Sequence, residues 1–279
     1  MKQRSMEIAG QRIAYLESPG GDDRTFIFVH GNSASARTWL PLLDGGFGER
    51  FRCFAFDLPG HGQSEPAKDE ASYSLPGYAA VLAEFAATAG AAGAVVVGWS
   101  LGGHIALEAA PALPEAAGFV IFGTPPVGSA AQMAEAFLPN PAMNVGFSAS
   151  VTEAEATAYA AAFTAPGSAL PASVFVPDIL ATDGTARAAL LASIGEGRFA
   201  DEVAIAAGLR QPLAILHGTG EQLVSLDYLR TLTIPSLWRG AVQLVPDAGH
   251  APHQEVPRQF SELLTEFSDD LAGDSRAAE

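Results

Sequence analysis

The chain has 279 residues, of which 48% are hydrophobic, and its formal net charge is −16. This length and composition suit one large α/β domain with an insertion, and the acidic balance argues against nucleic acids and anionic membrane surfaces as partners. No apolar run is long enough to span a membrane, and the N-terminal residues lack the apolar region of a signal peptide. We therefore expect a cytoplasmic protein that does not bind membranes.

Strand-like and helix-like segments alternate along much of the chain. Residues 6–17 alternate between apolar and polar side chains around Gly10, which predicts an edge hairpin. Further strands are expected at 25–29, 51–56, 94–97, 119–122, 213–216 and 242–245. Helices are expected near Trp39 and at 78–89, 105–110 and 257–271, with a frayed tail after the last one. This alternation is typical of an α/β fold, with a mostly parallel sheet and helices on both faces.

The pattern changes between Val127 and Gly208, where no comparable strand-like run occurs. Alanine-rich helical pieces are broken there by Pro139, Pro141, Pro166, Pro171 and Pro177. We predict that residues 127–208 form a helical cap inserted after the sixth strand. Residues 1–126 and 209–279 are then expected to form the core domain.

The segment Gly98-Trp99-Ser100-Leu101-Gly102 follows a buried strand and precedes an amphipathic run. This pattern is typical of a nucleophile elbow, in which a serine sits on a sharp strand-to-helix turn. Glycines two residues before and two residues after the serine remove side chains that would collide at such a turn. We predict that Ser100 is the nucleophile and that the N–H group of Leu101, at the start of the helix, stabilises an oxyanion.

A serine hydroxyl needs a base within hydrogen-bond reach, and the chain has six histidines. His30, His61 and His217 lie next to glycines at strand ends or tight turns, where an imidazole usually bonds to the backbone. His104 lies four residues past Ser100 on the helix, and His253 lies near the start of the last helix, where we expect it to be exposed. His250 follows the last strand, at the sheet edge that carries Ser100, so we predict that it is the base.

The base needs an orienting carboxylate, which should follow a strand and precede His250 in the chain. The loop after strand 213–216 offers Glu221 and, one helical stretch later, Asp227. Glu221 is favoured because it lies closer to the strand end and gives the order serine, glutamate, histidine. Asp227 and Asp247 stay open as substitutes.

Two further loops are expected at the same sheet edge. Gly31 and Asn32 follow strand 25–29, where the backbone can approach a substrate closely and supply the second oxyanion donor, with the Asn32 side-chain amide as a further donor. Asp57 ends strand 51–56, and we expect its carboxylate to hold the next turn through backbone hydrogen bonds.

These segments resemble the α/β-hydrolase superfamily over almost the whole chain. The motifs that carry the resemblance are HGN at 30–32, FDLPGHGQS at 56–64, GWSLGGH at 98–104 and DAGHAP at 247–252, followed by Glu255, Pro257 and Phe260. Three further features are similar to the N-acyl-homoserine lactonases of this fold: FGTPPV at 122–127, ATDGTAR at 181–187 and a glutamate, Glu221, in place of the commoner aspartate.

The narrower resemblance implies a triad of Ser100, Glu221 and His250, with Asn32 helping the oxyanion hole. It also implies a cap tyrosine that contacts the lactone, which in this chain is Tyr159. A half-buried packing role is an equally open reading of that tyrosine. Gly220 departs from the pattern, because relatives tend to carry a second acid beside the glutamate, so the anchoring of Glu221 is expected to differ.

The resemblance implies a serine hydrolase that opens the ring of N-acyl-homoserine lactones, without a metal or a cofactor. A carboxylesterase or C–C hydrolase with the same triad and a ligand receptor with little turnover are the alternatives. We expect the substrate to contact Gly31, Trp99 and Tyr159. Apolar cap residues can wall an acyl tunnel or form the cap's own small core: Met133, Phe137, Met143, Phe147 and Phe163. The single cysteine, Cys53, is interpreted as core packing, and the oligomeric state is left open.

Overall fold

A computed structural model describes residues 1–21 and 23–277, with side chains as far as residue 273. Its strands form one eight-stranded sheet in the order β1-β2-β4-β3-β5-β6-β7-β8. The strands are β1 (Lys2–Ile8), β2 (Gln11–Glu17), β3 (Thr25–Val29), β4 (Arg52–Phe56), β5 (Val95–Trp99), β6 (Gly118–Phe122), β7 (Leu213–Gly218) and β8 (Gln243–Val245). Every strand expected from the sequence is present.

The sheet is parallel apart from its first edge. Strand β1 pairs antiparallel with β2 through a tight turn at Ala9 and Gly10, both of which have positive φ, and β2 pairs antiparallel with β4. All the remaining pairs are parallel. Because parallel strands point the same way, their carboxyl ends meet at one edge of the sheet, where the loops can converge on a site.

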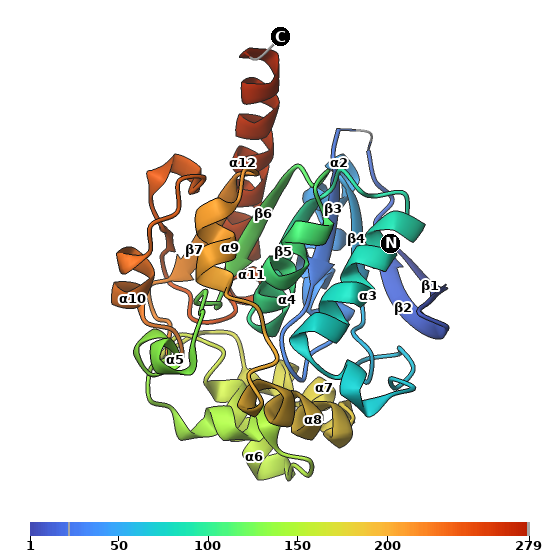
Figure 1. Ribbon diagram of the computed structural model, residues 1–279, viewed down its shortest axis with the longest axis vertical. Helices are drawn as coiled ribbons and strands as arrows, with labels where there is room; N and C mark the ends of the chain where they lie inside the picture. Colours follow the sequence, from blue (N-terminus) through green and yellow to red (C-terminus); the bar gives the residue numbers. More distant parts are fainter. Residues whose placement is uncertain (22, 278–279) are drawn as a thin grey trace.

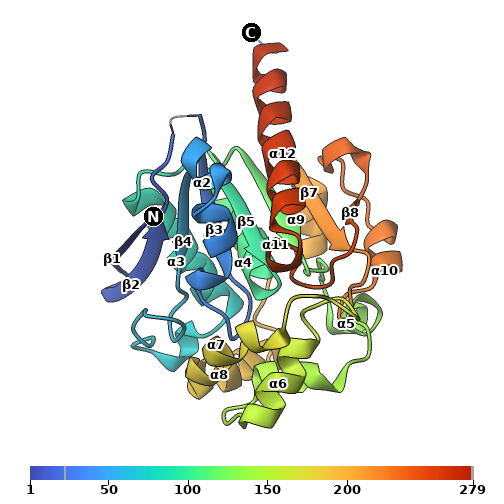
Figure 2. The ribbon, with the colours of Figure 1, turned by 180° about the vertical axis from the view of Figure 1, so that it is seen from behind.

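The α-helices of the described residues are α1 (Leu40–Leu43), α2 (Gly46–Arg50), α3 (Leu75–Thr88), α4 (Leu101–Ala109), α5 (Ala130–Ala136), α6 (Glu153–Ala161), α7 (Val176–Ala181), α8 (Gly184–Gly195), α9 (Glu202–Gly208), α10 (Leu226–Thr231), α11 (Pro252–Glu255) and α12 (Pro257–Ala277). Helices α3, α4 and α9 cover one face of the sheet, and α2 and α12 cover the other (Figures 1 and 2). The central strands β5 and β6 are buried along their whole length, as expected for a sheet covered on both faces.

Helices α5 to α8 gather beyond the carboxyl edge of the sheet, at the bottom of Figure 1. They are short and are linked by irregular and 3₁₀ segments, in keeping with the prolines that interrupt this stretch. Helix α9 also falls within the range 127–208, but it packs beside α4 on the face of the sheet. We refer to α5 to α8 and their connections as the cap, and the expected limit at Gly208 stays a prediction.

The ends of some elements differ from the expectation. The last helix continues to Ala277, six residues beyond the expected end at Leu271, so the part of the tail that the structure describes is helical rather than frayed. The first strand begins at Lys2 instead of Met6, because its pairing with β2 extends to Glu17. Among the helices described, none is long and apolar enough to cross a bilayer.

Candidate active site

Ser100 occupies a strained turn between β5 and α4. Its φ of 53° and ψ of −118° lie outside the regions that residues with a side chain favour. The flanking glycines permit this turn, since a Cβ atom on Gly98 would lie 2.3 Å from the carbonyl oxygen of Gly102. A Cβ atom on Gly102 would lie 2.2 Å from the carbonyl oxygen of Val29. The elbow expected from the sequence is therefore present.

Strand β6 and the loop after it hold the elbow in place. The N–H group of Ser100 donates to the carbonyl oxygen of Phe122 at 2.9 Å. The hydroxyl of Thr124 donates to the carbonyl oxygen of Ser100 at 2.7 Å. These bonds fix the backbone on both sides of the strained residue, which leaves the position of the Ser100 side chain well defined.

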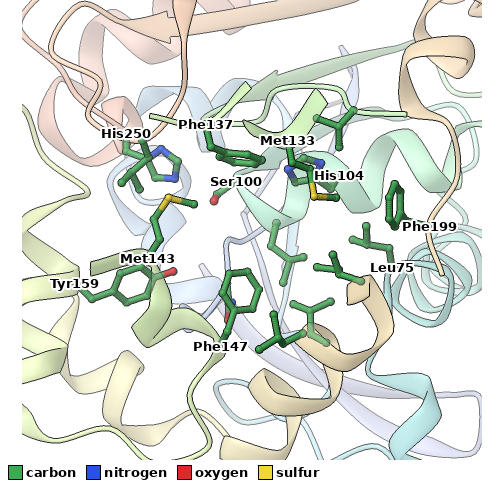
Figure 3. Close-up of a pocket in the computed structure, with 17 residues that line it drawn as sticks. Leu75, Ser100, His104, Met133, Phe137, Met143, Phe147, Tyr159, Phe199 and His250 are labelled. Carbon is green, nitrogen blue, oxygen red and sulfur yellow. The ribbon is translucent and has the colours of Figure 1, made fainter. Parts of the chain in front are cut away.

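The Ser100 side chain opens into a cavity of about 300 Å³ between the sheet edge and the cap (Figure 3). His250, Asn32 and Tyr159 line the same cavity. Most of the remaining lining side chains are apolar and come from the cap and its surroundings: Leu75, Leu101, Val127, Met133, Phe137, Met143, Phe147, Leu190, Leu191, Ile194, Phe199 and Leu223. The Ser100 side chain thus faces an apolar space with a few polar groups, which is the usual character of a small-molecule site.

Glu221 and His250 form a buried pair at the carboxyl edge, in the loops after β7 and β8. The Nδ1 atom of His250 lies 2.9 Å and 3.1 Å from the two carboxylate oxygens of Glu221. Their side chains are only 3% and 1% exposed, respectively. Because Nδ1 faces Glu221, Nε2 is the ring nitrogen left for proton transfer with a group in the cavity.

The surroundings of Glu221 favour its ionised form. Burial acts to raise the pKa of the carboxyl, but the charge and hydrogen bond of His250 and the N–H group of Leu223 outweigh it, so the pKa lies below its ordinary value. The two substitutes considered from the sequence lie elsewhere. The Asp227 side chain is 97% exposed beside Arg230, and Asp247 lies on the surface.

Gly220 has a steric reason to lack a side chain. A Cβ atom at this position would lie 2.6 Å from the Cβ atom of Ala165, in the segment that follows α6. Glu221 is anchored instead by the N–H group of Leu223, which donates to its carboxylate at 2.8 Å. The close approach of the cap segment thus takes the place of a second acid.

Glu255 ties that cap segment to the loop that carries His250. Its two carboxylate oxygens accept hydrogen bonds from the N–H groups of Ala165, at 2.8 Å, and Gly249, at 2.7 Å. Ala251 also donates from its N–H group to the carbonyl oxygen of Phe163 at 2.8 Å. The loop that carries His250 is therefore bonded to the cap on both sides of the histidine.

The residues expected to form an oxyanion hole lie at the start of α4 and in the loop after β3. Leu101 is the first residue of α4, where backbone N–H groups lack partners within the helix. Gly31 packs closely against the elbow, since a Cβ atom there would lie 3.2 Å from the Cβ atom of Ser100. The Asn32 side-chain amide donates to the carbonyl oxygen of Gly146 in the cap, so this side chain links the two parts of the protein.

The residues expected to contact substrate differ in their placement. Tyr159 lines the cavity, and its buried phenol has a raised pKa, so the hydroxyl keeps its proton as a donor. Trp99 is not among the residues that line the cavity, and its indole N–H donates to the carbonyl oxygen of His250 at 2.8 Å. Phe163 packs against Trp99 behind the site, whereas Met133, Phe137, Met143 and Phe147 line the cavity.

Two of the three histidines beside glycines bond to the backbone as expected, whereas the buried Nδ1 atom of His217 has no hydrogen-bond partner among the described residues. His30 bonds through both ring nitrogens to the backbone of Gly31 and Leu58, and His61 bonds to the carbonyl oxygen of Pro59, as expected. The expectation that His253 is exposed is wrong. Helix α11 tucks this residue under the elbow, where it is fully buried and bonded to the Thr38 hydroxyl.

Asp57 holds its loops as expected. Its carboxylate accepts hydrogen bonds from the N–H groups of Ala36, at 2.6 Å, and Gln63, at 2.8 Å.

The sequence reasoning missed Thr124, Glu255 and Glu202, the last of which bonds to His104. The position of His104 one helical turn after Ser100 was a signal that its ring reaches the site. The partner of that ring comes from a helix about a hundred residues away, which no local pattern indicates.

A serine and a histidine at one cavity, with a buried carboxylate beside the histidine, suit attack on a carbonyl carbon. The crystal structure of the N-acyl homoserine lactonase AidH with N-butanoyl homoserine has a TM-score of 0.91 and 35% sequence identity, covering 97% of each chain. A putative aryl esterase from Burkholderia cenocepacia has a TM-score of 0.81 and 21% identity, covering 98% of this chain and 100% of that chain. The latter likeness shows the fold alone.

Curated relatives match over shorter stretches. The pimeloyl-acyl-carrier-protein methyl ester esterase of Hamiltonella defensa is 35% identical over 101 residues, which are 36% of this chain and 36% of the relative. The dihydrolipoyllysine-residue acetyltransferase component of the acetoin cleaving system of Cupriavidus necator is 36% identical over 109 residues, 39% of this chain and 28% of the relative. These matches span about a third of the relatives' length. The model of the alpha/beta hydrolase family matches residues 26–263, and the chain therefore belongs to this family.

Proposed function

We propose that this protein is a serine hydrolase that opens the lactone ring of N-acyl-homoserine lactones, with Ser100, His250 and Glu221 as its triad. The observation that carries the proposal is the apolar cavity into which Ser100 and His250 open together. The likeness to the lactonase AidH over 97% of both chains supports the same substrate class. Such an activity would quench signalling by these lactones.

The first half of the reaction forms an acyl-enzyme. The Ser100 hydroxyl attacks the ring carbonyl carbon while Nε2 of His250 takes its proton, and Glu221 stabilises the resulting imidazolium. The N–H group of Leu101 and the loop at residues 31–32 hold the negative oxygen that forms. Collapse of this intermediate breaks the bond to the ring oxygen, which receives the proton from His250.

Hydrolysis of the acyl-enzyme must be faster than the reaction that closes the lactone ring again. The hydroxyl released by ring opening stays tethered to the acyl group, so it can attack the new ester and close the ring again. A water molecule that gives its proton to His250 attacks the same carbon and releases Ser100. The product is an N-acyl homoserine carboxylate, whose charge is repelled by a protein of net charge −16.

The cavity offers separate places for the two ends of such a substrate. The Tyr159 hydroxyl and the Asn32 amide are polar groups within reach of the substrate amide, and both residues line the cavity. Leu75, Leu190 and Phe199 extend the lining away from them and can enclose an acyl chain.

An esterase acting on other acyl groups is the second candidate function. The match to a pimeloyl-acyl-carrier-protein methyl ester esterase over 101 residues favours it, because the same triad attacks any accessible ester carbonyl. The two functions differ in what the cap admits. A hydrolase-fold receptor would bind the same ligands with very slow turnover.

The test is a hydrolysis screen of the purified protein with N-acyl-homoserine lactones and p-nitrophenyl esters of matched chain length. We expect mass spectrometry to show lactones that gain one water with the amide intact, and acidification to restore the ring. Release of a free fatty acid would indicate an acylase instead. Fast turnover of aryl esters with inert lactones would favour the esterase, and tight binding without turnover would favour a receptor.

A further inference from the structure

A second buried histidine–glutamate pair lies at the same cavity. The Nδ1 atom of His104, on α4, is 2.9 Å from both carboxylate oxygens of Glu202, on α9. The Glu202 side chain is fully buried, and that of His104 is 13% exposed. The proposed mechanism does not use this pair.

Glu202 fixes the orientation of the His104 ring. One of its carboxylate oxygens also accepts a hydrogen bond from the N–H group of Val127 at 3.0 Å, and its own N–H group donates to the Val127 carbonyl oxygen. A buried carboxylate is costly unless such bonds compensate it. Because Glu202 engages Nδ1, the His104 nitrogen that a ligand can reach is Nε2.

The His104 ring lines the cavity among apolar side chains. Its ring lies against that of Phe137, with centroids 6.2 Å apart, and Met133 and Phe199 line the same region (Figure 3). A polar nitrogen in an apolar wall has few hydrogen bonds to water, so a ligand atom that bonds to it adds to the binding free energy.

The spacing along α4 indicates which ligand atom could do so. His104 lies four residues after Ser100, about 6 Å along a helix axis. In an N-acyl-homoserine lactone, the third carbon of the acyl chain is five bonds from the reacting carbonyl carbon, which is a comparable distance. An oxygen on that carbon would reach His104 when the chain follows the apolar wall.

We propose that His104, oriented by Glu202, forms a polar subsite for an oxygen substituent on the acyl chain. It selects lactones that carry a hydroxyl or keto group at the third acyl carbon. This choice of substrate rests on the proposed function. A neutral Nε2 accepts a hydrogen bond from the hydroxyl, and a protonated Nε2 donates to the keto oxygen.

The experiment compares kcat/KM for N-octanoyl, N-(3-hydroxyoctanoyl) and N-(3-oxooctanoyl) homoserine lactones in the native protein and in His104→Leu. We expect the preference for a substituted chain over the plain chain to fall by about tenfold in the variant, as for the loss of one hydrogen bond in a buried site. Glu108→Gln is the matched control. Glu108 lies one turn further along α4 and accepts a hydrogen bond from Ala200, next to α9, but does not line the cavity.

A folded His104→Leu variant with an unchanged preference would overturn the subsite. The pair of His104 and Glu202 would then serve only to hold α4 and α9 together. The same loss of preference in Glu108→Gln would also overturn it. Should His104→Leu fail to fold because Glu202 is left unpaired, the double variant with Glu202→Gln removes that charge and takes the same measurement.

Failure of the proposed function gives a different result. If the native protein hydrolyses none of the lactones, the comparison moves to p-nitrophenyl hexanoate and p-nitrophenyl 6-hydroxyhexanoate. The carbon that bears the hydroxyl is again five bonds from the reacting carbonyl carbon in the second ester. A preference for the hydroxylated ester that depends on His104 would support the subsite without the lactonase, and no such preference would reject both.

Discussion

Two buried histidine–glutamate pairs face one cavity in this protein, yet they suit different tasks. In both pairs Nδ1 of the histidine lies 2.9 Å from a carboxylate oxygen of a buried glutamate. Glu221 and His250 lie in loops at the carboxyl ends of two strands, whereas His104 and Glu202 lie on helices α4 and α9. In the proposed mechanism only His250 acts as a base, so a glutamate partner alone does not assign that role, and the element that carries the ring decides which atoms it can reach.

A third buried carboxylate sharpens this comparison. Asp57 lies at the end of β4 and is held by backbone N–H groups, without an imidazole as a hydrogen-bond partner. Burial raises its pKa to about 6, whereas the pKa of Glu221 lies below its ordinary value because the imidazole outweighs burial. The partner therefore decides whether the pKa of a carboxyl at this sheet edge is raised or lowered.

The largest expected effect comes from removing the nucleophile between the two pairs. Ser100→Ala should lower kcat by about a thousandfold or more, because no other group in the proposed mechanism attacks the carbonyl. The fold should persist, since alanine is smaller than serine and the glycines of the elbow remain. Steady-state hydrolysis together with a circular dichroism melt checks both statements, and a folded variant that keeps its activity would place the nucleophile elsewhere.

Replacing each glutamate by glutamine should distinguish the two pairs by their effect on kcat. Glu221→Gln should cost about 10²- to 10⁴-fold in kcat, because the imidazolium of His250 loses its stabilising charge. Glu202→Gln and Asp227→Asn should change kcat on a plain acyl chain far less, since neither carboxylate contacts His250. Measured side by side on one lactone, equal losses in Glu221→Gln and Glu202→Gln would break the distinction between the pairs.

The raised pKa of Asp57 should make the free energy of unfolding depend on pH. A folded-state pKa of about 6, above the ordinary 3.8, corresponds to about 3 kcal/mol of stability. This stability is fully present below pH 3.8 and is lost as the pH rises through 6, because the native state holds the proton more tightly than the unfolded state.

Asp57→Asn removes that titration. The free energy of unfolding of the native protein minus that of the variant should therefore fall by about 2.4 kcal/mol between pH 4 and pH 7. Urea denaturation at a series of pH values measures this difference. Parallel stability curves for the two proteins would show that Asp57 titrates normally.

The smallest expected effect concerns the cap. Phe147→Ala should shift the ratio of kcat/KM between short and long acyl chains by about tenfold, because this ring lines the cavity. Phe163→Leu is the matched comparison, since that ring packs on Trp99 and His250 outside the lining. It should lower the melting temperature and leave the ratio unchanged. Equal shifts of the ratio would mean that the cap acts through its packing alone.

The sequence predicted the sheet well because its strands are apolar runs with a sharp end. Residues 25–29 are bounded by Arg24 and His30, and residues 119–122 by Gly118 and Gly123; apolar runs of this kind are typically buried in parallel sheets. The helices were harder to place. Helix α9 reads as one more cap helix in the sequence, and only its contacts with α4 assign it to the face of the sheet.

The candidate site was predictable to the extent that it lies at strand ends. Ser100, Glu221 and His250 each follow a strand, so chain order and the shared sheet edge were enough to select them. The contacts of Glu255 and Glu202 depend on where cap segments and α9 come back to the core. Those positions follow from tertiary packing, which leaves no periodic signal in the sequence.

The bonds of Glu255 have a consequence for how the cavity opens. One carboxylate holds both the cap at Ala165 and the loop of His250 at Gly249, and Asn32 holds the cap at Gly146. A cap that swung outward would break these bonds and release the loops that carry the proposed base, His250, and the proposed oxyanion donors at residues 31–32. Entry of a ligand and the chemical step would therefore depend on the same hydrogen bonds. A substitution that loosens the cap should change the rate of the bond-breaking step as well as the rate at which the ligand enters the cavity.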